Sequence, residues 1–477
     1  MRFAMRAKAL MTAAFLAVGV DSSEGAWAQD YVVAETPATL IKQVETLRTA
    51  GLHDRMGYEI IESLTTEIGP RLAGSAREAA AQDWAVAKLK ALGFSNIQVE
   101  PFEMEGWARG IETAHVVGAA AQPLTITTLG GSVATPDGGI TAEVARFDDL
   151  YQLEAAPDGS LDGKIVFIDL KMYKTQDGSS YGNTNYIRGN TPSVAARKGA
   201  VATLIRSVGT DSHRFPHTGG TRYADDVPAI PAAALSNPDA DQLSRLLERG
   251  PVSIKLEMTP KSLGTVTSGN VIADIMGSEK PEEVVVIGGH LDSWDLGTGA
   301  IDDGAGIGIT MAAAKRILDL GIAPRRTIRL ILWGAEEVGL LGARAYAKAH
   351  ADELANHVIA AESDFGAGRI WRFESRVGAE DLPFIRAIHR QLRPLGIGMG
   401  ANEAGGGPDV IPLRQAGVPV VSLTQDGSDY FDLHHTADDT FDKIELDNIQ
   451  QNIAAYAVFT WMAANLDVDF RPDAEQP

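Results

Sequence analysis

Short, solidly apolar runs alternate with stretches of helical periodicity along the second half of the chain. The predicted strands are 284–289, 327–333, 358–361 and 418–423, and the predicted helices are 304–320, 339–350, 383–392 and 446–464. Strands without a polar face must be covered on both sides, which is typical of parallel strands joined by helices. The pattern therefore predicts an α/β fold with a mainly parallel, mixed sheet and helices on both faces.

A similar pattern occurs near the N-terminus. Apolar residues recur at helical spacing over 39–51 and 58–68, and Ser75 can cap a further helix that runs to about residue 92. A strand is predicted at 96–102, where apolar positions are spaced among polar ones. This segment is expected to begin the α/β unit.

Residues 110–261 have a different texture, with short β-like runs, many glycines and prolines and few long helical patterns. A strand is predicted at 164–170, and a helix at 195–199 leads into a strand at 200–205. The segment resembles the protease-associated domain, a small β-rich insert of exported peptidases, whose role would be to wall or lid an active-site cleft. The polar, glycine-rich stretch 175–192 is interpreted as either a mobile lid or a solvated loop.

These patterns divide the chain into five segments. The predicted order is a signal peptide (1–28), the N-terminal part of a catalytic domain (29–110), the protease-associated-like insert (111–261), the main part of the catalytic domain (262–467) and a polar tail (468–477). A chain of 477 residues is too long for one ordinary core, so two compact units are expected.

Composition narrows the function classes. The hydrophobic fraction of 45% and the charged fraction of 22% are those of a soluble globular protein. Acidic side chains outnumber basic ones by 63 to 42, and the net charge of −21 argues against nucleic acid and anionic membranes as partners. The chain has no cysteine, so any metal must be held by histidine and carboxylate.

The first 28 residues have the form of an export signal. Arg2, Arg6 and Lys8 precede an apolar stretch at 9–20, and Ala26-Trp27-Ala28 offers a cleavage site. About twelve apolar residues are too few to cross a bilayer, which needs roughly 20. We therefore expect a periplasmic or secreted protein without membrane attachment after cleavage.

Polar residues with metal-binding chemistry follow the predicted strands. They are His290, Asp292, the pair Asp302-Asp303, the pair Glu336-Glu337, Asp364 and His435. Each alone has an ordinary explanation, such as helix capping, a solvated turn or a structural histidine. The carboxyl ends of parallel strands meet at one edge of a sheet, however, and carboxylates gathered there repel one another unless a cation neutralises them. The combination predicts a metal site.

The donor types indicate which metal this site would hold. Imidazole and carboxylate without thiolate suit zinc, with cobalt or manganese as substitutes. Five ligand positions are too many for one catalytic zinc ion and suit two ions that share a bridging carboxylate. Two ions about 3.5–4 Å apart can hold a water between them as nucleophile and polarise a scissile carbonyl. One carboxylate must stay free to move the proton, and Glu336, beside Glu337, is placed for that role.

Four motifs occur in the order and spacing of a known family: GGHLDSWDLGTGAIDDGAG, LWGAEEVGLLGARAYA, ESDFG and HHTADDTFDKI. Together with TEIGPRLAGSAREAAAQDWAVAKLKALGF near the N-terminus, they resemble the co-catalytic zinc exopeptidases, which include bacterial leucyl-type aminopeptidases and plasma glutamate carboxypeptidase. The resemblance spans most of the chain outside the insert, and the insert makes plasma glutamate carboxypeptidase the closer comparison. It implies an exopeptidase with two zinc ions that removes N-terminal residues from short peptides or splits dipeptides.

The resemblance also implies a role for each candidate residue. The implied roles are one zinc ion held by His290 and Asp364, the other by Glu337 and His435, a bridge by Asp302, a general base in Glu336, and a carboxylate that orients a histidine ligand in Asp292. Three alternatives stay open, because Asp303, Glu362 and His434 could take the places of Asp302, Asp364 and His435.

Substrate recognition is less legible. Residues 405–409 lie where the family builds part of its substrate pocket, and Tyr430 or Phe431 could line it, although ordinary loop chemistry explains those glycines as well. The partners expected are short peptides or dipeptides, and a homodimer is compatible with the sequence. Two rival functions keep the fold: a non-catalytic ectodomain that binds a partner, and a glutaminyl-cyclase-like acyl transferase with one zinc ion.

Overall fold

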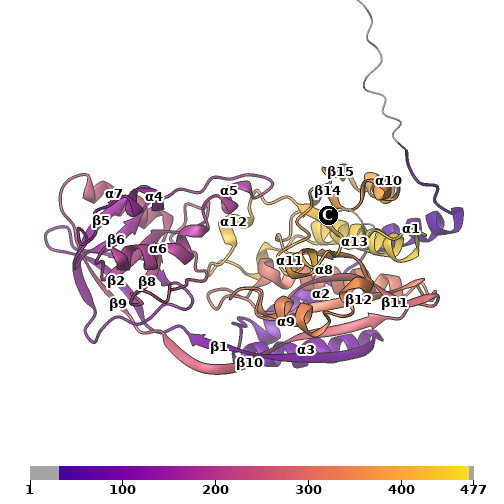
Figure 1. Cartoon of the computed structure of the whole chain (residues 1–477), viewed down its shortest axis with the longest axis horizontal. Helices are drawn as coiled ribbons and strands as arrows, with labels where there is room; N and C mark the ends of the chain where they lie inside the picture. The colour runs from indigo at the N-terminus through magenta and orange to yellow at the C-terminus, as the bar shows by residue number, and fades with distance from the viewer. Residues whose placement is uncertain (1–31, 472–477) are drawn as a thin grey trace, which may run out of the picture.

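The computed structural model describes residues 32–471. The predicted signal peptide, 1–28, lies outside this range, as do residues 472–477 of the predicted tail. Within the described range the chain forms two eight-stranded sheets that lie side by side, each with its own helices (Figure 1).

The first sheet carries the strands predicted in the second half of the chain. Its order is β1 (Ser95–Ala108), β10 (Lys261–Ile275), β12 (Arg326–Trp333), β11 (Lys280–His290), β13 (His357–Glu362), β16 (Val420–Gln425), β14 (Ile370–Arg376) and β15 (Gly398–Met399). The central strands β12, β11, β13 and β16 run parallel, and antiparallel strands extend the sheet at both ends.

Alternate residues of the central strands are buried on opposite faces of this sheet. Val285 and Ile287 of β11 face one core, whereas Val284 and Val286 face another. The first core contains residues of α1 (Ala38–Gly51), α2 (Met56–Ser63), α3 (Ala76–Leu92), α8 (Ala305–Leu318), α10 (Leu382–Leu392) and α13 (Leu446–Asn465). The second contains residues of α9 (Leu341–Ala349) and α11 (Ile411–Gln415). The predicted mixed, mainly parallel sheet with helices on both faces is confirmed.

The second sheet is formed by residues 112–258, inside the segment predicted as an insert. Its order is β3 (Gln122–Leu124), β2 (Glu112–Val117), β9 (Ser253–Met258), β5 (Ile140–Phe147), β6 (Ile165–Ile168), β7 (Ala202–Arg206), β8 (Ala232–Leu235) and β4 (Ile126–Thr128). Its helices are α4 (Leu150–Glu154), α5 (Ser179–Gly182), α6 (Tyr186–Arg197) and α7 (Asn237–Leu247). We call residues 111–261 the insert; its relationship to the protease-associated domain stays a prediction.

A long antiparallel ribbon connects the insert to the first sheet. Strands β1 and β10 pair along most of their length, from Ser95 opposite Asp274 to Ala108 opposite Lys261. Because the chain leaves for the insert at the end of β1 and returns at the start of β10, the two crossings lie next to each other. The ribbon is the edge of the first sheet and runs along the lower side of the molecule in Figure 1.

The interpretation of 175–192 as a solvated loop is wrong, because this stretch contains α5 and the first half of α6, whereas the lid role stays a prediction. Pro192 lies inside α6 and cannot donate a hydrogen bond to the carbonyl of Arg188. The hydroxyl of Thr221 donates to that carbonyl instead, at 2.8 Å. A helix in which tertiary contacts supply the missing bond is not legible from local sequence. Within residues 32–471, no helix combines the length and the apolar character that a membrane crossing requires.

Arg326, at the start of β12, holds the end of α13 against the sheet. Its buried guanidinium donates to the carbonyls of Leu466 and Val468, each at 2.7 Å, and pairs with Glu283. Replacing Arg326 with Met should lower the free energy of unfolding by about 2–4 kcal/mol, because buried acceptors lose their donors.

Urea unfolding measures this loss, and the neighbouring Arg325 offers a matched control. Arg325 pairs with the solvent-exposed side chains of Glu279 and Asp467, so Arg325→Met should cost less than about 1 kcal/mol. Equal losses in the two variants would contradict the assigned role of Arg326.

Candidate metal centre

The predicted site residues lie at the carboxyl ends of the four central parallel strands. His290 is the last residue of β11, Glu336 and Glu337 follow the end of β12, and Asp364 follows β13. His435 follows β16 and the short helix α12 (Tyr430–Leu433). The open edge of an α/β sheet therefore brings together residues from distant parts of the sequence.

One group of possible ligands consists of His290, Asp302 and Asp364, whose ligand atoms lie within 4.8 Å of one another. His290 Nε2 lies 3.0 Å from Asp302 Oδ1 and 3.8 Å from Asp364 Oδ1. His290 Nδ1 donates to the main-chain oxygen of Asp292 at 3.0 Å, which leaves Nε2 as the ligand atom. All three side chains are buried or nearly so.

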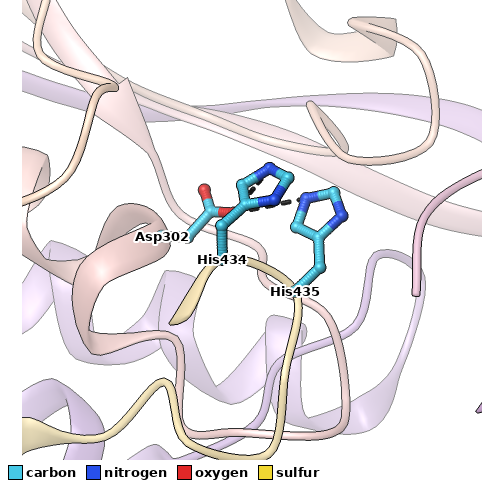
Figure 2. Close-up of side chains that lie close together, drawn as sticks. All are labelled: Asp302, His434 and His435. Atoms are coloured by element: carbon cyan, nitrogen blue, oxygen red, sulfur yellow. Dashed lines mark ion pairs between the residues drawn. The ribbon is translucent and has the colours of Figure 1, made fainter. Parts of the chain in front are cut away.

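A second group lies on the other side of Asp302. His435 Nε2 is 2.9 Å from Glu337 Oε2 and 3.3 Å from Asp302 Oδ2. His434 Nε2 also faces Asp302 Oδ2, at 3.7 Å, and its ring stacks on that of His435 (Figure 2). Asp302 therefore stands between the two groups, as a bridging ligand must. Both histidines reach it, but only His435 faces a second carboxylate as well.

The electrostatics of this cluster favour a bound cation. Asp302 Oδ2, Glu337 Oε1 and His434 Nδ1 are buried and have no hydrogen-bond partner among the described residues. Burial raises the pKa of Glu336 well above its ordinary value, and repulsion from Asp364 and Glu337 adds to this rise. Burial and the charge of Asp302 likewise raise the pKa of Glu337. Zinc binds carboxylate oxygens and imidazole nitrogens, and here such atoms are buried without a hydrogen-bond partner among the described residues. The residues present therefore fit a metal centre.

The alternative carboxylates have other partners. Asp303 accepts hydrogen bonds from the backbone N–H groups of His290 and Gly306, at 3.0 and 2.9 Å, and so fixes the start of α8. Glu362 Oε2 accepts from the backbone N–H of Asp409 at 2.7 Å, although its Oε1 has no partner among the described residues. These contacts favour Asp302 and Asp364 as ligands.

Asp292 binds the backbone of the segment that carries the two glutamates. Its carboxylate accepts from the N–H groups of Glu336 and Glu337, at 3.0 and 3.3 Å. The same carboxylate lies 3.6 Å from His290 Nδ1, farther than its own main-chain oxygen. The side chain of Asp292 therefore positions the glutamates more directly than it positions the histidine.

Two residues that sequence reasoning did not select hold the Asp302 loop, which includes the short helix η2 (Ala300–Gly304). Arg71 is fully buried and donates to the carbonyls of Thr298 and Gly299, at 2.7 and 2.9 Å. Asp439 accepts from the N–H groups of Ile301 and Asp302, at 2.6 and 3.3 Å. Both residues stand in motifs that carry the family resemblance, Asp439 in HHTADDTFDKI and Arg71 in TEIGPRLAGS, and this was the available signal.

The insert also contacts the second group of ligands. His435 Nδ1 lies 3.2 Å from the main-chain oxygen of Thr218, and the Thr218 N–H donates to the His435 carbonyl at 3.0 Å. Thr218 stood in a segment with no motif of its own, so the sequence offered no signal for this contact. The structure shows that a candidate ligand is oriented by the insert.

A cavity of about 950 Å³ opens over these residues and is walled by both parts of the chain. The part of the chain that forms the first sheet contributes Glu336, Tyr430, Phe431 and residues 405–408 to the lining of this cavity. The insert contributes Gly178, Tyr181, Arg188 and Arg222, among others. Three of these insert residues belong to the stretch 175–192, so that stretch is part of the cavity wall.

Comparison with known proteins places this geometry in a family. A model of peptidase family M28 matches residues 270–460. Carboxypeptidase Q of Mus musculus is 36% identical over 432 residues, which cover 89% of this chain and 89% of that protein. The chain belongs to peptidase family M28. The resemblance to co-catalytic zinc exopeptidases is confirmed, and so is the prediction of a metallo-exopeptidase, a hydrolase.

Solved structures agree with membership of family M28. A crystal structure of a peptidase M28 precursor from Shewanella amazonensis has 52% identity and a TM-score of 0.90, covering 91% of this chain and 98% of that one. A zinc aminopeptidase from Bacillus subtilis has 20% identity and a TM-score of 0.63, covering 87% and 95%, and shares the fold. The M28 match at 270–460 includes every candidate ligand, whereas Arg71 and Thr218 lie outside it.

Zinc should stabilise the metal-free protein through this centre. At a hundredfold excess over Kd, ligand binding to the folded state alone adds on the order of 2–3 kcal/mol to the free energy of unfolding. Asp302→Asn should remove most of that gain, because Asp302 faces both groups of ligands. Unfolding with and without zinc measures the effect.

Asp274→Asn is the matched control, since Asp274 is also a buried aspartate but pairs with Arg329 away from the site. This variant should be less stable than the parent and keep the full zinc-dependent gain. Full zinc stabilisation of Asp302→Asn would rule against Asp302 as a ligand.

Proposed function

We propose that this M28 peptidase is an exopeptidase that acts on short peptides or dipeptides with two zinc ions bound at the sheet edge. The observation that carries the proposal is the position of Asp302, whose two oxygens face His290 on one side and His435 on the other. A carboxylate between two separate sets of ligands suits a pair of ions better than a single one.

The proposed ligand sets follow from these contacts. One zinc ion would be held by His290, Asp302 and Asp364. The other would be held by Asp302, Glu337 and His435, with His434 next to the same oxygen of Asp302. When bound, zinc acts as a Lewis acid on the scissile carbonyl and lowers the pKa of the attacking water. Cobalt and manganese accept the same donors and are expected to substitute.

Glu336 is the proposed general base. It lines the cavity beside Glu337, and the Asp292 carboxylate fixes its backbone. Burial holds its pKa above the ordinary value, which suits a group that must accept a proton from water and return it to the leaving amine. Tyr430, Phe431 and the cavity wall supplied by the insert would confine the substrate and exclude bulk water.

Two rival functions are disfavoured by particular features. A non-catalytic binding domain would not need two possible ligand groups that share Asp302, with the buried Glu336 beside them. A glutaminyl-cyclase-like acyl transferase would use one ion and would leave the Glu337 and His435 pair without a role. Export to the periplasm or medium and a homodimeric state remain proposals from the sequence.

Glu336→Gln provides the direct test of the base. The substitution keeps size and polarity but removes the proton acceptor, so kcat should fall by about 10²–10⁴-fold while zinc content stays near that of the parent. Glu353→Gln, at an exposed glutamate that pairs with His350 and does not line the cavity, serves as the control and should retain activity. Comparable turnover in Glu336→Gln and the parent would exclude this mechanism.

A substrate panel tests the reaction class. Zinc-loaded protein is incubated with dipeptides, tripeptides and their N-acylated counterparts, and the products are identified by mass. An exopeptidase that removes N-terminal residues releases free amino acids from unblocked peptides and is slowed by N-acylation. Cyclised product without free amino acid would support the acyl-transferase alternative, and no turnover with a full metal content would support the binding domain.

A further inference from the structure

The loop that carries His435 is held between the two parts of the chain. We call residues 426–436 the His435 loop; it includes α12, which lies between the two sheets beside α5 (Figure 1). The insert makes backbone hydrogen bonds at three places along it: Gly427 N–H to Gln176 O, Thr210 N–H to Phe431 O, and Thr218 N–H to His435 O, all 2.9–3.0 Å. The His435 loop is thus docked on the insert as well as on the sheet.

His217 adds a side-chain contact at the most demanding point of this loop. Its ring is fully buried, and Nδ1 lies 2.6 Å from the main-chain oxygen of His434. Its Nε2 faces Asp211 Oδ2 at 3.3 Å, and its backbone N–H donates to Ser207 Oγ at 2.8 Å. Gly209 lies flat against the ring, since a Cβ there would come within 2.2 Å of ring atoms. Asp211 and Gly209, both insert residues, therefore hold the imidazole with Nδ1 toward the His434 carbonyl.

The backbone of His435 needs such support. Its φ is +63°, in the left-handed region, where the Cβ of a non-glycine residue approaches the following carbonyl oxygen too closely. The insert binds the peptide units on both sides of His435. His217 Nδ1 contacts the carbonyl of His434, and the Thr218 N–H donates to the carbonyl of His435. Fixing both peptide planes fixes φ and ψ of the residue between them, and strained conformations persist only where the surroundings determine them in this way.

We propose that His217 is a positioning residue for the metal centre: through the His434 carbonyl it holds His435 in the conformation in which Nε2 faces Glu337 and Asp302. The inference rests on the proposed function, because it assumes that His435 binds metal. It makes docking of the insert a condition for tight binding of the ion between Glu337 and His435. The insert supplies this support, since His217 and its partner Asp211 both belong to it.

Metal binding by His217 variants tests the proposal without reference to activity. His217→Leu removes the donor, whereas the side-chain N–H of His217→Asn can take the place of Nδ1–H. Loss of an outer hydrogen bond to a metal site typically costs about 10–100-fold in metal affinity, and His217→Leu should weaken one of the two ions by that factor. His217→Asn should recover most of the affinity. Chelator competition measures affinity, and the visible spectrum of the cobalt-loaded protein reports the ligand geometry.

His357→Leu is the matched control. His357 is a second buried histidine whose two ring nitrogens also face partners, Tyr346 Oη at 2.8 Å and the Glu353 carbonyl at 3.1 Å, but it lies at the start of β13, at the other end of that strand from Asp364. This variant should lose stability and keep both metal affinities and the cobalt spectrum. Gly209→Ala provides an independent test, because the added Cβ displaces the His217 ring without removing it. It should lower the affinity for the same ion, and it replaces His217→Leu if that variant does not fold.

The outcomes separate this inference from the proposed function. A parent protein that binds no metal at this centre would overturn the proposed function itself. A parent that binds two ions, with unchanged affinities and cobalt spectra in His217→Leu or Gly209→Ala, would overturn only the positioning role. Equal loss of affinity in His217→Leu and His357→Leu would also overturn it, since general destabilisation would then explain the effect.

Discussion

Buried carboxylates that repel one another govern how the metal centre and its surrounding loops are built. Asp302, Glu336, Glu337 and Asp364 converge at the carboxyl edge of one sheet, where burial raises the pKa values of both glutamates and of Asp364. Such a cluster is unfavourable unless cations occupy it. The fold has to keep the ligand carboxylates close enough to share ions, and it has to keep Glu336 free of metal for proton transfer.

The chain meets this constraint by using further carboxylates as backbone acceptors. Asp303, Asp292 and Asp439 each bind main-chain N–H groups next to a candidate ligand or base. Arg71 binds the carbonyls of the loop that precedes Asp302. The loops that carry the ligands are therefore fixed by hydrogen bonds that do not need a metal, which is how a pre-organised site is built.

The insert, which lies outside the residues matched by the M28 model, adds further hydrogen bonds to the metal centre. It orients His435 through Thr218 and His217, and it walls the cavity with α5 and α6. Its two crossings from the first sheet share the β1 and β10 ribbon, so the insert remains tied to the sheet whose edge it covers. The same lobe therefore shapes the substrate cavity and supports one half of the metal centre.

Apolar periodicity and motif spacing are local properties, so the sequence alone predicted the four central parallel strands, the main helices of the first sheet and the donor types. It did not decide between Asp302 and Asp303, which differ only in the direction their side chains take from a loop. It also missed the helical nature of 175–192, where Thr221 replaces the hydrogen bond that Pro192 removes. Nor did it mark His217 as a neighbour of the metal centre. Those points depended on contacts between distant segments, and such contacts exist only after the sheet and the insert have packed together.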